Sequence, residues 1–135
     1  MTNSRLRINS DGASRGNPGQ SAIGATVKDE QGRLVASVSR TIGRATNNQA
    51  EYRALIAALE KAAELGAQRV DVCLDAELVV RQLQGRYRVK SAALRPLYLR
   101  AAGLLGKFEA FTIAAVPRTE NAEADHLANQ ALDRD

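Results

Sequence analysis

The stretch DGASRGNPGQSAIGA at residues 11–25 decides how the chain begins to fold. A residue pattern typical of a strand precedes it, and a second such pattern begins within it at residue 22. Leu6 and Ile8 alternate with polar residues ahead of Asp11, which indicates a half-buried strand that ends at this acid. The residues ASRGNPGQ (13–20) that follow are typical of a turn. We therefore expect the chain to open with a strand, a turn and a second strand.

Two apolar runs, at about 22–28 and 33–42, flank the turn-rich tetrapeptide DEQG (29–32) and predict an antiparallel hairpin. Beyond the hairpin, the pattern changes to helices and short strands. The expected elements are a helix over 48–65, a strand over 70–74, a helix over 76–85, a helix over 92–105, a strand over 108–116 and a helix over 119–132. Thr46 or Asn47 is available to cap the first of these helices, and Gly66 is available to end it.

Three strands in a meander, followed by alternating helices and strands, imply an α/β fold with a mixed sheet and helices on both faces, since parallel strands need crossover connections. A chain of 135 residues, 44% of them hydrophobic, suits one domain over residues 1–135. No stretch is apolar enough to span a membrane, and the polar start MTNSRLRINSDG lacks the apolar region of a signal peptide. We expect a cytoplasmic protein that does not contact a membrane.

The cysteine count and the net charge exclude some classes of protein. A single cysteine, Cys73, excludes a disulfide framework and a cysteine-based zinc site, and its apolar neighbours predict a buried, inert thiol. The formal net charge of +4 is consistent with a polyanionic partner, but it is also common in proteins without one. Charge alone therefore does not assign a function.

Four acidic residues stand at positions from which they can converge. Asp11 and Asp75 each end a predicted strand, and in open α/β sheets ligands gather at the carboxyl ends of the strands. Helical periodicity places Glu51 and Asp125 on the inward faces of their helices. Four such acids would repel one another unless a divalent cation compensated their charge, and oxygen ligands suit magnesium or manganese. Any one of them alone could instead be a helix cap, a turn residue or a solvated charge.

Four blocks of sequence, in order, resemble the type 1 ribonuclease H family: DGASRGNPGQSAIGA (11–25), TNNQAEYRALIAAL (46–59), LDAELVVRQLQGRYRVK (74–90) and VPRTENAEADHLANQAL (116–132). The resemblance covers nearly the whole chain. It implies the ribonuclease H fold, which has a five-stranded mixed sheet of three antiparallel strands, two further strands parallel to the first, and flanking helices. It also implies an endonuclease that hydrolyses the RNA strand of RNA/DNA hybrids and leaves 5′-phosphomonoesters. Two Mg²⁺ or Mn²⁺ ions would be held by Asp11, Glu51, Asp75 and Asp125.

The resemblance further indicates residues that contact the substrate. These are Gly12, Ser14, Arg15, Gly16, Asn17, Asn47, Asn48, Arg86, Tyr87 and Arg118. The three asparagines resemble residues that contact the minor groove of the hybrid, where 2′-hydroxyls separate RNA from DNA. For Asn47 and Asn48, capping of the helix is the alternative. The basic stretch RQLQGRYRVK (81–90) could hold phosphates of the DNA strand, or it could be a solvated helix end.

Several features depart from the family pattern. Members with a histidine in the loop before the last acid use it as a proton shuttle, whereas Arg118 stands nearest to that position here and cannot act as a base near neutral pH. The only histidine, His126, lies about 100° around the helix from Asp125, so surface exposure is expected. Ala76 replaces the serine that often follows the third acid, which removes a helix cap. The long basic extension of some relatives is absent.

Three functions are compatible with this sequence. The first is cleavage of RNA/DNA hybrids by a monomer, with double-stranded RNA as a further substrate because recognition of an A-like shape can be permissive. The second is a module that binds nucleic acid without cutting it, which a missing acid would indicate. The third is a nuclease for another structure, such as a DNA junction, because a fold alone does not choose the chemistry. The four acids favour the first function, and the GNPG and TNN blocks argue against the third.

Overall fold

A computed structural model describes residues 4–134 of the chain. Its elements are, in chain order, β1 (Arg5–Gly16), β2 (Gly19–Lys28), β3 (Leu34–Ala45), α1 (Asn47–Glu64), β4 (Arg69–Leu74), α2 (Glu77–Leu83), α3 (Arg95–Leu105), β5 (Ala110–Ala115), the 3-10 turn η1 (Arg118–Asn121) and α4 (Ala122–Arg134). Among these helices, none is both long enough and apolar enough to cross a membrane.

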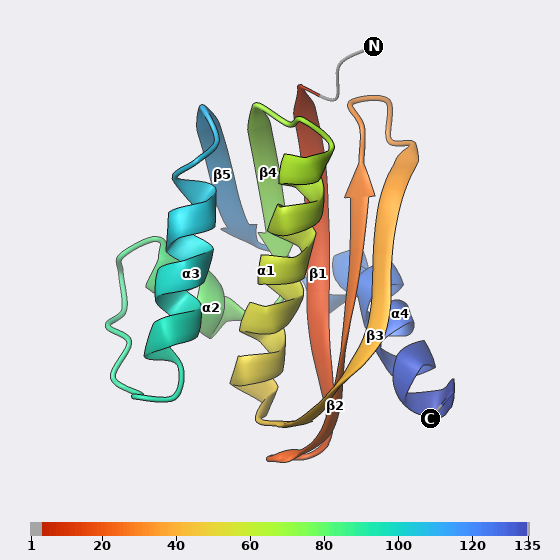
Figure 1. The fold of residues 1–135 in the computed structure, drawn as a ribbon, viewed down its shortest axis with the longest axis vertical. Coiled ribbons are helices and arrows are strands. Elements are labelled where there is room, and N and C mark those ends of the chain that lie inside the picture. The colour runs from red at the N-terminus through yellow and green to blue at the C-terminus, as the bar shows by residue number, and fades with distance from the viewer. Residues whose placement is uncertain (1–3, 135) are drawn as a thin grey trace.

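The strands form one mixed sheet in the order β3-β2-β1-β4-β5 (Figure 1). β1, β2 and β3 pair in antiparallel fashion, β4 lies parallel to β1, and β5 lies parallel to β4. The expected five-stranded mixed sheet is therefore confirmed. The pairing of β1 with β4 ends where Asn9 lies opposite Cys73. Asp11 and Asp75, each two positions further along the chain, therefore lie side by side at the point where these two strands part.

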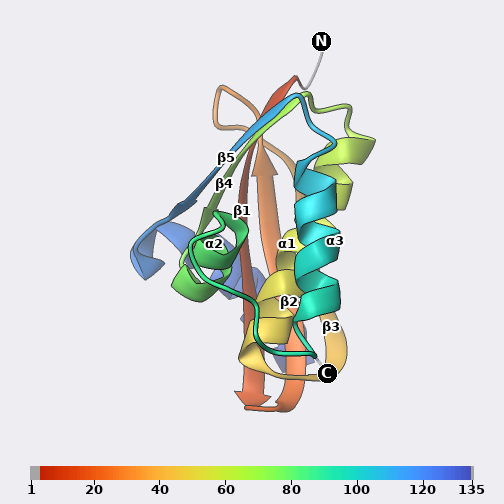
Figure 2. The same ribbon diagram turned by 90° about the vertical axis from the view of Figure 1, so that its left-hand side faces the viewer.

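Helices cover both faces of the sheet, as expected. α1 and α3 pack together on one face, whereas α4 packs on the other face against β1, β2 and β3 (Figures 1 and 2). The core between the sheet and α1 is apolar and closed to solvent. Its largest fully buried side chains include Leu6, Ile8, Ile23, Tyr52, Leu55, Leu59, Val70, Val72 and Leu74. Burial of alternate residues in β4 agrees with the strand pattern of the sequence.

The expectation that the first strand ends at Asp11 and that 13–20 is a turn was wrong. β1 continues to Gly16 because its pairing with β2 continues to the Gly16–Gly19 pair, and the side chains of Ser14 and Ser21 bond across the two strands at 2.6 Å. Two residues, Asn17 and Pro18, are left to make the turn. Residue types that favour turns are therefore tolerated within a long hairpin when hydrogen bonds between the strands pair the backbone N–H and C=O groups.

Other boundaries differ by a few residues. α1 begins as expected and ends before Gly66, whose φ of +81° suits a glycine. α3 begins at Arg95 rather than at residue 92, and β5 is shorter than the predicted 108–116 and mostly exposed at the sheet edge. Cys73 is half-buried rather than buried, because its side of β4 is not the face that α1 covers; the guanidinium of Arg7 approaches its Sγ at 3.6 Å.

We expect Gly24→Ala to lower the melting temperature by about 5 °C, because the added Cβ would collide with the backbone of α4 at Ala124 and Ala128 and overpack this contact. The matched control is Gly103→Ala in α3, where a Cβ meets no atom within 4 Å. That variant should be as stable as the wild type or slightly more stable, because alanine favours a helix. Thermal unfolding of both variants checks this, and equal melting temperatures would show that α4 does not depend on Gly24.

Candidate metal and nucleic-acid site

Three carboxyl groups meet at the end of the parallel strands. Oxygens of Asp11, Glu51 and Asp75 lie within 4.8 Å of one another. Asp11 comes from β1 and is only 6% exposed, and Asp75 directly follows β4. Glu51 reaches them from the N-terminal part of α1, and the backbone N–H of Gly12 donates to its Oε1 at 2.7 Å. The strand register and the start of one helix thus bring these acids together.

The fourth acid, Asp125, lies near this cluster but not within it. It lines the same cavity of about 360 Å³ as the other three acids. Its Oδ1 accepts a hydrogen bond of 3.2 Å from Asn129, and the guanidinium of Arg118 lies 3.8 Å away. Asn129 and Arg118 therefore hold this carboxylate from the side of α4.

Burial and mutual repulsion make ionisation of the cluster unfavourable. Burial, followed by the carboxyl groups of Glu51, Asp125 and Asp75, raises the pKa of Asp11 to about 10. Burial also raises the pKa of Glu51, although the hydrogen bonds with Asp11 and with the backbone of Gly12 oppose this shift. A divalent cation would supply the missing positive charge, and a donor set made only of carboxylate oxygens fits a hard cation such as Mg²⁺ or Mn²⁺.

Asn121 is a residue of this site that the sequence did not reveal. It is 1% exposed, and its Nδ2 donates to Asp75 Oδ1 at 2.7 Å and to the carbonyl oxygen of Ser10 at 2.9 Å. Its Oδ1 accepts from Nδ2 of Asn9 at 3.2 Å. Asn121 thus fixes Asp75 against β1. The sequence signal is an asparagine four residues before the last acid, and because asparagine is also common at helix starts, residue type alone does not distinguish the two roles.

The hairpin and the start of α1 place several predicted substrate residues beside the acids. Gly12, Ser14, Asn47 and Arg118 line the cavity of the four acids. Asn17 accepts a hydrogen bond of 3.0 Å from the backbone N–H of Asn47, which ties the hairpin turn to the helix. These residues form a polar rim next to the carboxylates.

The capping alternative for Asn47 and Asn48 was wrong. Thr46 caps α1 and forms a capping box with Gln49, whose side chain accepts from the backbone N–H of Thr46 at 2.8 Å. Asn47 and Asn48 occupy the first two helical positions, and both are exposed. Their side chains are therefore not needed to start the helix. Ala76 makes no side-chain cap for α2, as its residue type predicts.

Other predicted substrate residues lie outside the cavity of the acids. Arg15 and Gly16 are exposed at the end of the hairpin, where Arg15 pairs with Asp133. Arg86 and Tyr87 are exposed beyond α2, and neither lines the cavity. His126 is exposed as expected, and it lines a separate hollow beside Leu34 and Leu127 rather than the cavity of the acids. The structure therefore does not bring every predicted site residue together.

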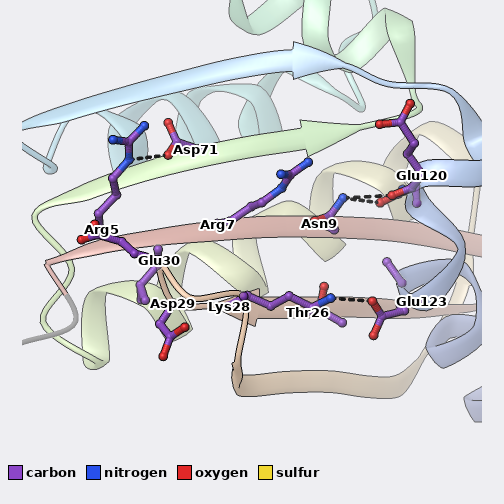
Figure 3. A pocket seen from close by; sticks show the side chains of 14 residues that line it. Arg5, Arg7, Asn9, Thr26, Lys28, Asp29, Glu30, Asp71, Glu120 and Glu123 are labelled. Atoms are coloured by element: carbon purple, nitrogen blue, oxygen red, sulfur yellow. Dashed lines mark hydrogen bonds and ion pairs between the residues drawn. The ribbon is translucent and has the colours of Figure 1, made fainter.

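A larger cavity of about 520 Å³ lies on the open face of the sheet, away from the four acids. Figure 3 shows two ion pairs among its charged side chains: Arg5 bonds to Asp71 at 2.8 Å, and Lys28 bonds to Glu123 at 2.6 Å. These two pairs, together with the pair of Asp29 and Arg33, satisfy several of the charges at its walls without a ligand. Size alone therefore does not make this cavity the functional site.

Comparison with known proteins agrees with this fold. A family model described as reverse transcriptase-like matches residues 9–131. Ribonuclease HI of Halobacterium salinarum is 49% identical over 96% of the chain, and the chain spans 65% of that protein. The crystal structure of RNase H1 from this archaeon has a TM-score of 0.95 at 48% identity, covering 97% of this chain and 99% of that one.

Two further relatives are a longer protein and a protein solved with a bound nucleic acid. A bifunctional protein of Mycobacterium tuberculosis is 46% identical over 96% of this chain, which spans only 36% of that protein. LC11-RNase H1, isolated from compost, was solved in complex with an RNA/DNA hybrid. That structure has a TM-score of 0.90 at 40% identity and covers 96% of this chain and 97% of its own.

Without divalent cations, the wild-type melting temperature should fall as pH rises from about 6 to 9. The folded state holds the proton of Asp11 up to a pKa of about 10, whereas the unfolded carboxyl loses it near its ordinary value, so the folded state binds more protons throughout this range and its stability decreases with pH. Asp11→Asn should remove most of this decline and should melt about 3 °C or more above the wild type at pH 9.

The control for this prediction is Asp71→Asn on the open face of the sheet. Burial alone would raise the pKa of Asp71, but bonds from Arg5 and Thr112 outweigh it and lower the pKa. Its replacement should therefore lower the melting temperature by a similar amount at every pH from 6 to 9. Thermal unfolding in chelator checks both variants, and parallel curves for the wild type and Asp11→Asn would contradict the prediction.

Proposed function

The chain belongs to the type 1 ribonuclease H family, and on that premise we propose that residues 1–135 form one ribonuclease H domain that hydrolyses the RNA strand of RNA/DNA hybrids. The observation that carries the proposal is the convergence of Asp11, Glu51 and Asp75 in a cavity that Asp125 also lines. One chain supplies all four acids, so a monomer suffices for the reaction. The products would be 5′-phosphomonoesters.

Neighbouring residues support three of the four acids. We propose that Asp11, Glu51, Asp75 and Asp125 hold two Mg²⁺ or Mn²⁺ ions. Divalent cations bound there would activate the attacking water and stabilise the leaving 3′-oxygen. Gly12 orients Glu51, Asn121 orients Asp75, and Asn129 with Arg118 restrains Asp125. These neighbours keep the carboxylates in place while they carry like charge, which is what a preorganised site requires.

The polar rim supports recognition of a hybrid. Ser14 and Asn47 line the cavity, and Asn17 is bonded to the start of α1, so these residues can meet 2′-hydroxyls and sugar oxygens in a minor groove. The complex of LC11-RNase H1 with an RNA/DNA hybrid supports the same substrate class. The exposed basic segment 86–90, with its arginines and lysine, would contact phosphates of the DNA strand.

Asp75→Asn should reduce cleavage of a labelled RNA/DNA hybrid by about 10³-fold or more, because it removes a carboxylate from the cluster without changing the shape of the side chain. Asp71→Asn is the matched control, since it makes the same replacement four residues earlier on β4 and lies outside this cavity; its rate should stay within about twofold of the wild type. The assay includes magnesium, manganese and chelator arms.

Double-stranded RNA, duplex DNA and a DNA junction serve as further substrates in the same assay. Cleavage of the hybrid alone, or of the hybrid and double-stranded RNA, supports the proposal. A hybrid that stays uncut in both metals, or a junction that is cut faster, would overturn it.

His126→Ala should change turnover of the hybrid by less than about twofold, because its side chain is exposed and lines a different hollow from the four acids. Arg118→Ala is the contrasting variant and should slow turnover, since its guanidinium lies 3.8 Å from Asp125 and faces the cavity. Initial rates at saturating hybrid check both. A tenfold loss with His126→Ala would mean that this imidazole handles a proton in the reaction.

A further inference from the structure

A buried polar pair joins the helix that carries Glu51 to the helix that precedes the basic segment. Tyr52 is 0% exposed and Gln82 is 4% exposed, although both side chains carry polar atoms. The hydroxyl of Tyr52 donates to Oε1 of Gln82 at 2.5 Å. The pair thus forms a fixed bond between α1 and α2.

The other end of the Gln82 amide holds the basic segment. Its Nε2 donates to the carbonyl oxygen of Arg88 at 3.4 Å. The backbone N–H groups of Arg86 and Tyr87 donate to the carbonyl oxygen of Arg81, at 2.9 and 3.2 Å. Segment 86–90 therefore folds back against the end of α2, while the side chains of Arg86 and Arg88 remain exposed.

A second contact fixes the aromatic residue of this segment. Nη1 of Arg81 donates to the hydroxyl of Tyr87 at 2.9 Å, and the guanidinium carbon lies 5.4 Å from the centre of the Tyr87 ring. These contacts hold Tyr87 to α2, but they do not connect α2 to the rest of the domain. One side-chain hydrogen bond connects α1 to the unit formed by α2 and segment 86–90, which is the bond between Tyr52 and Gln82. Residues 4–134 contain no other side-chain hydrogen bond between these parts.

The helix α2, which lies between Tyr52 and the basic segment, is short. α2 has seven residues and begins at Glu77, after Ala76, whose side chain provides no cap. Val79 and Val80 are buried, and Leu83 and Val89 pack against the same core, but none of these apolar contacts has a directional bond. A buried hydrogen-bonded pair adds direction, and an apolar pair of the same volume would pack without it. A polar pair at this position therefore serves to orient α2 rather than to increase burial.

We infer that Gln82, held by Tyr52, is a positioning residue that sets where the cations of segment 86–90 meet the phosphates of the nucleic acid. This inference rests on the proposed function, since it concerns binding of the same substrate. Asp75 precedes α2 but is fixed separately by Asn121, so a shift of segment 86–90 leaves the carboxylates in place. Loss of the pair therefore affects substrate affinity and not the chemical step.

The test compares Gln82→Leu with Gln84→Leu. Gln82→Leu should raise KM for the hybrid about fivefold, leave kcat within about twofold, and reduce the slope of log KM against log salt by about one, as expected for one lost phosphate contact. Gln84 lies two residues further along and bonds instead to the carbonyl oxygen of Ile113 at 3.0 Å, in an exposed position. Gln84→Leu should leave KM, kcat and the salt slope unchanged.

A double variant separates positioning from stability. Tyr52→Phe alone leaves the buried Gln82 amide without its donor and should lower the melting temperature by about 5 °C. Tyr52→Phe combined with Gln82→Leu removes both polar groups, so its melting temperature should return close to that of the wild type while KM stays raised. A role in stability alone would restore KM together with the melting temperature.

The outcomes distinguish this inference from the function on which it rests. If the wild type does not cleave the hybrid, the proposed function fails. If the wild type cleaves it and Gln82→Leu keeps the wild-type KM and salt slope, the inference fails and the proposed function stands. A fall in kcat with an unchanged KM would also overturn it, because Gln82 would then act on the carboxylates.

Discussion

The burial of the Asp11 carboxyl group beside two other acids is the constraint on which the rest of the structure depends. A lone buried carboxylate is costly, and two acidic neighbours increase the cost. The chain tolerates this arrangement because Asp11 is fixed in the central strand β1 by pairing with Gly24 of β2, and because α1 packs over the same strand. The fold therefore places mutually repelling carboxyl groups at a point where a bound cation would compensate their charge.

The two helices that carry acids approach the sheet over glycines. A Cβ at Gly12 would collide with the backbone of Ala50 and Glu51, and a Cβ at Gly24 would collide with the backbone of Ala124 and Ala128. Each glycine thus lets a helix come close enough to deliver its acid, which is Glu51 in α1 and Asp125 in α4. The need for backbone contact at both faces explains why small residues stand where a larger apolar residue would add burial. The same close approach of helix and sheet at Gly12 and Gly24 therefore serves both the packing of the helices and the placement of the acids.

The sequence predicts the helices and strands that periodicity and residue type determine. It does not predict contacts and strand ends that depend on residues far apart in the chain. The apolar pattern of α1 and the glycine after it predict this helix closely, and alternation predicts β4. The sequence could not predict that Asn121 donates a hydrogen bond to Asp75, because this contact depends on the approach of η1 to β1, which no local pattern encodes. The extension of β1 beyond Asp11 also depends on pairing with β2, and it overrides turn-forming residues.

Position 118 changes how the site can handle protons. Among residues 4–134, the cavity is lined by the four acids, by Arg118 and by neutral side chains, with no imidazole, thiol or amine. Arg118 is a guanidinium, which donates hydrogen bonds and has no acceptor, so it can attract phosphate but cannot act as a base. The groups of this cavity that titrate are therefore the carboxyl groups themselves, and their ionisation is linked to the binding of a cation. In such a site, the pH dependence of turnover follows the competition between protons and cations for the same oxygens, so a higher cation concentration should have the same effect as a higher pH.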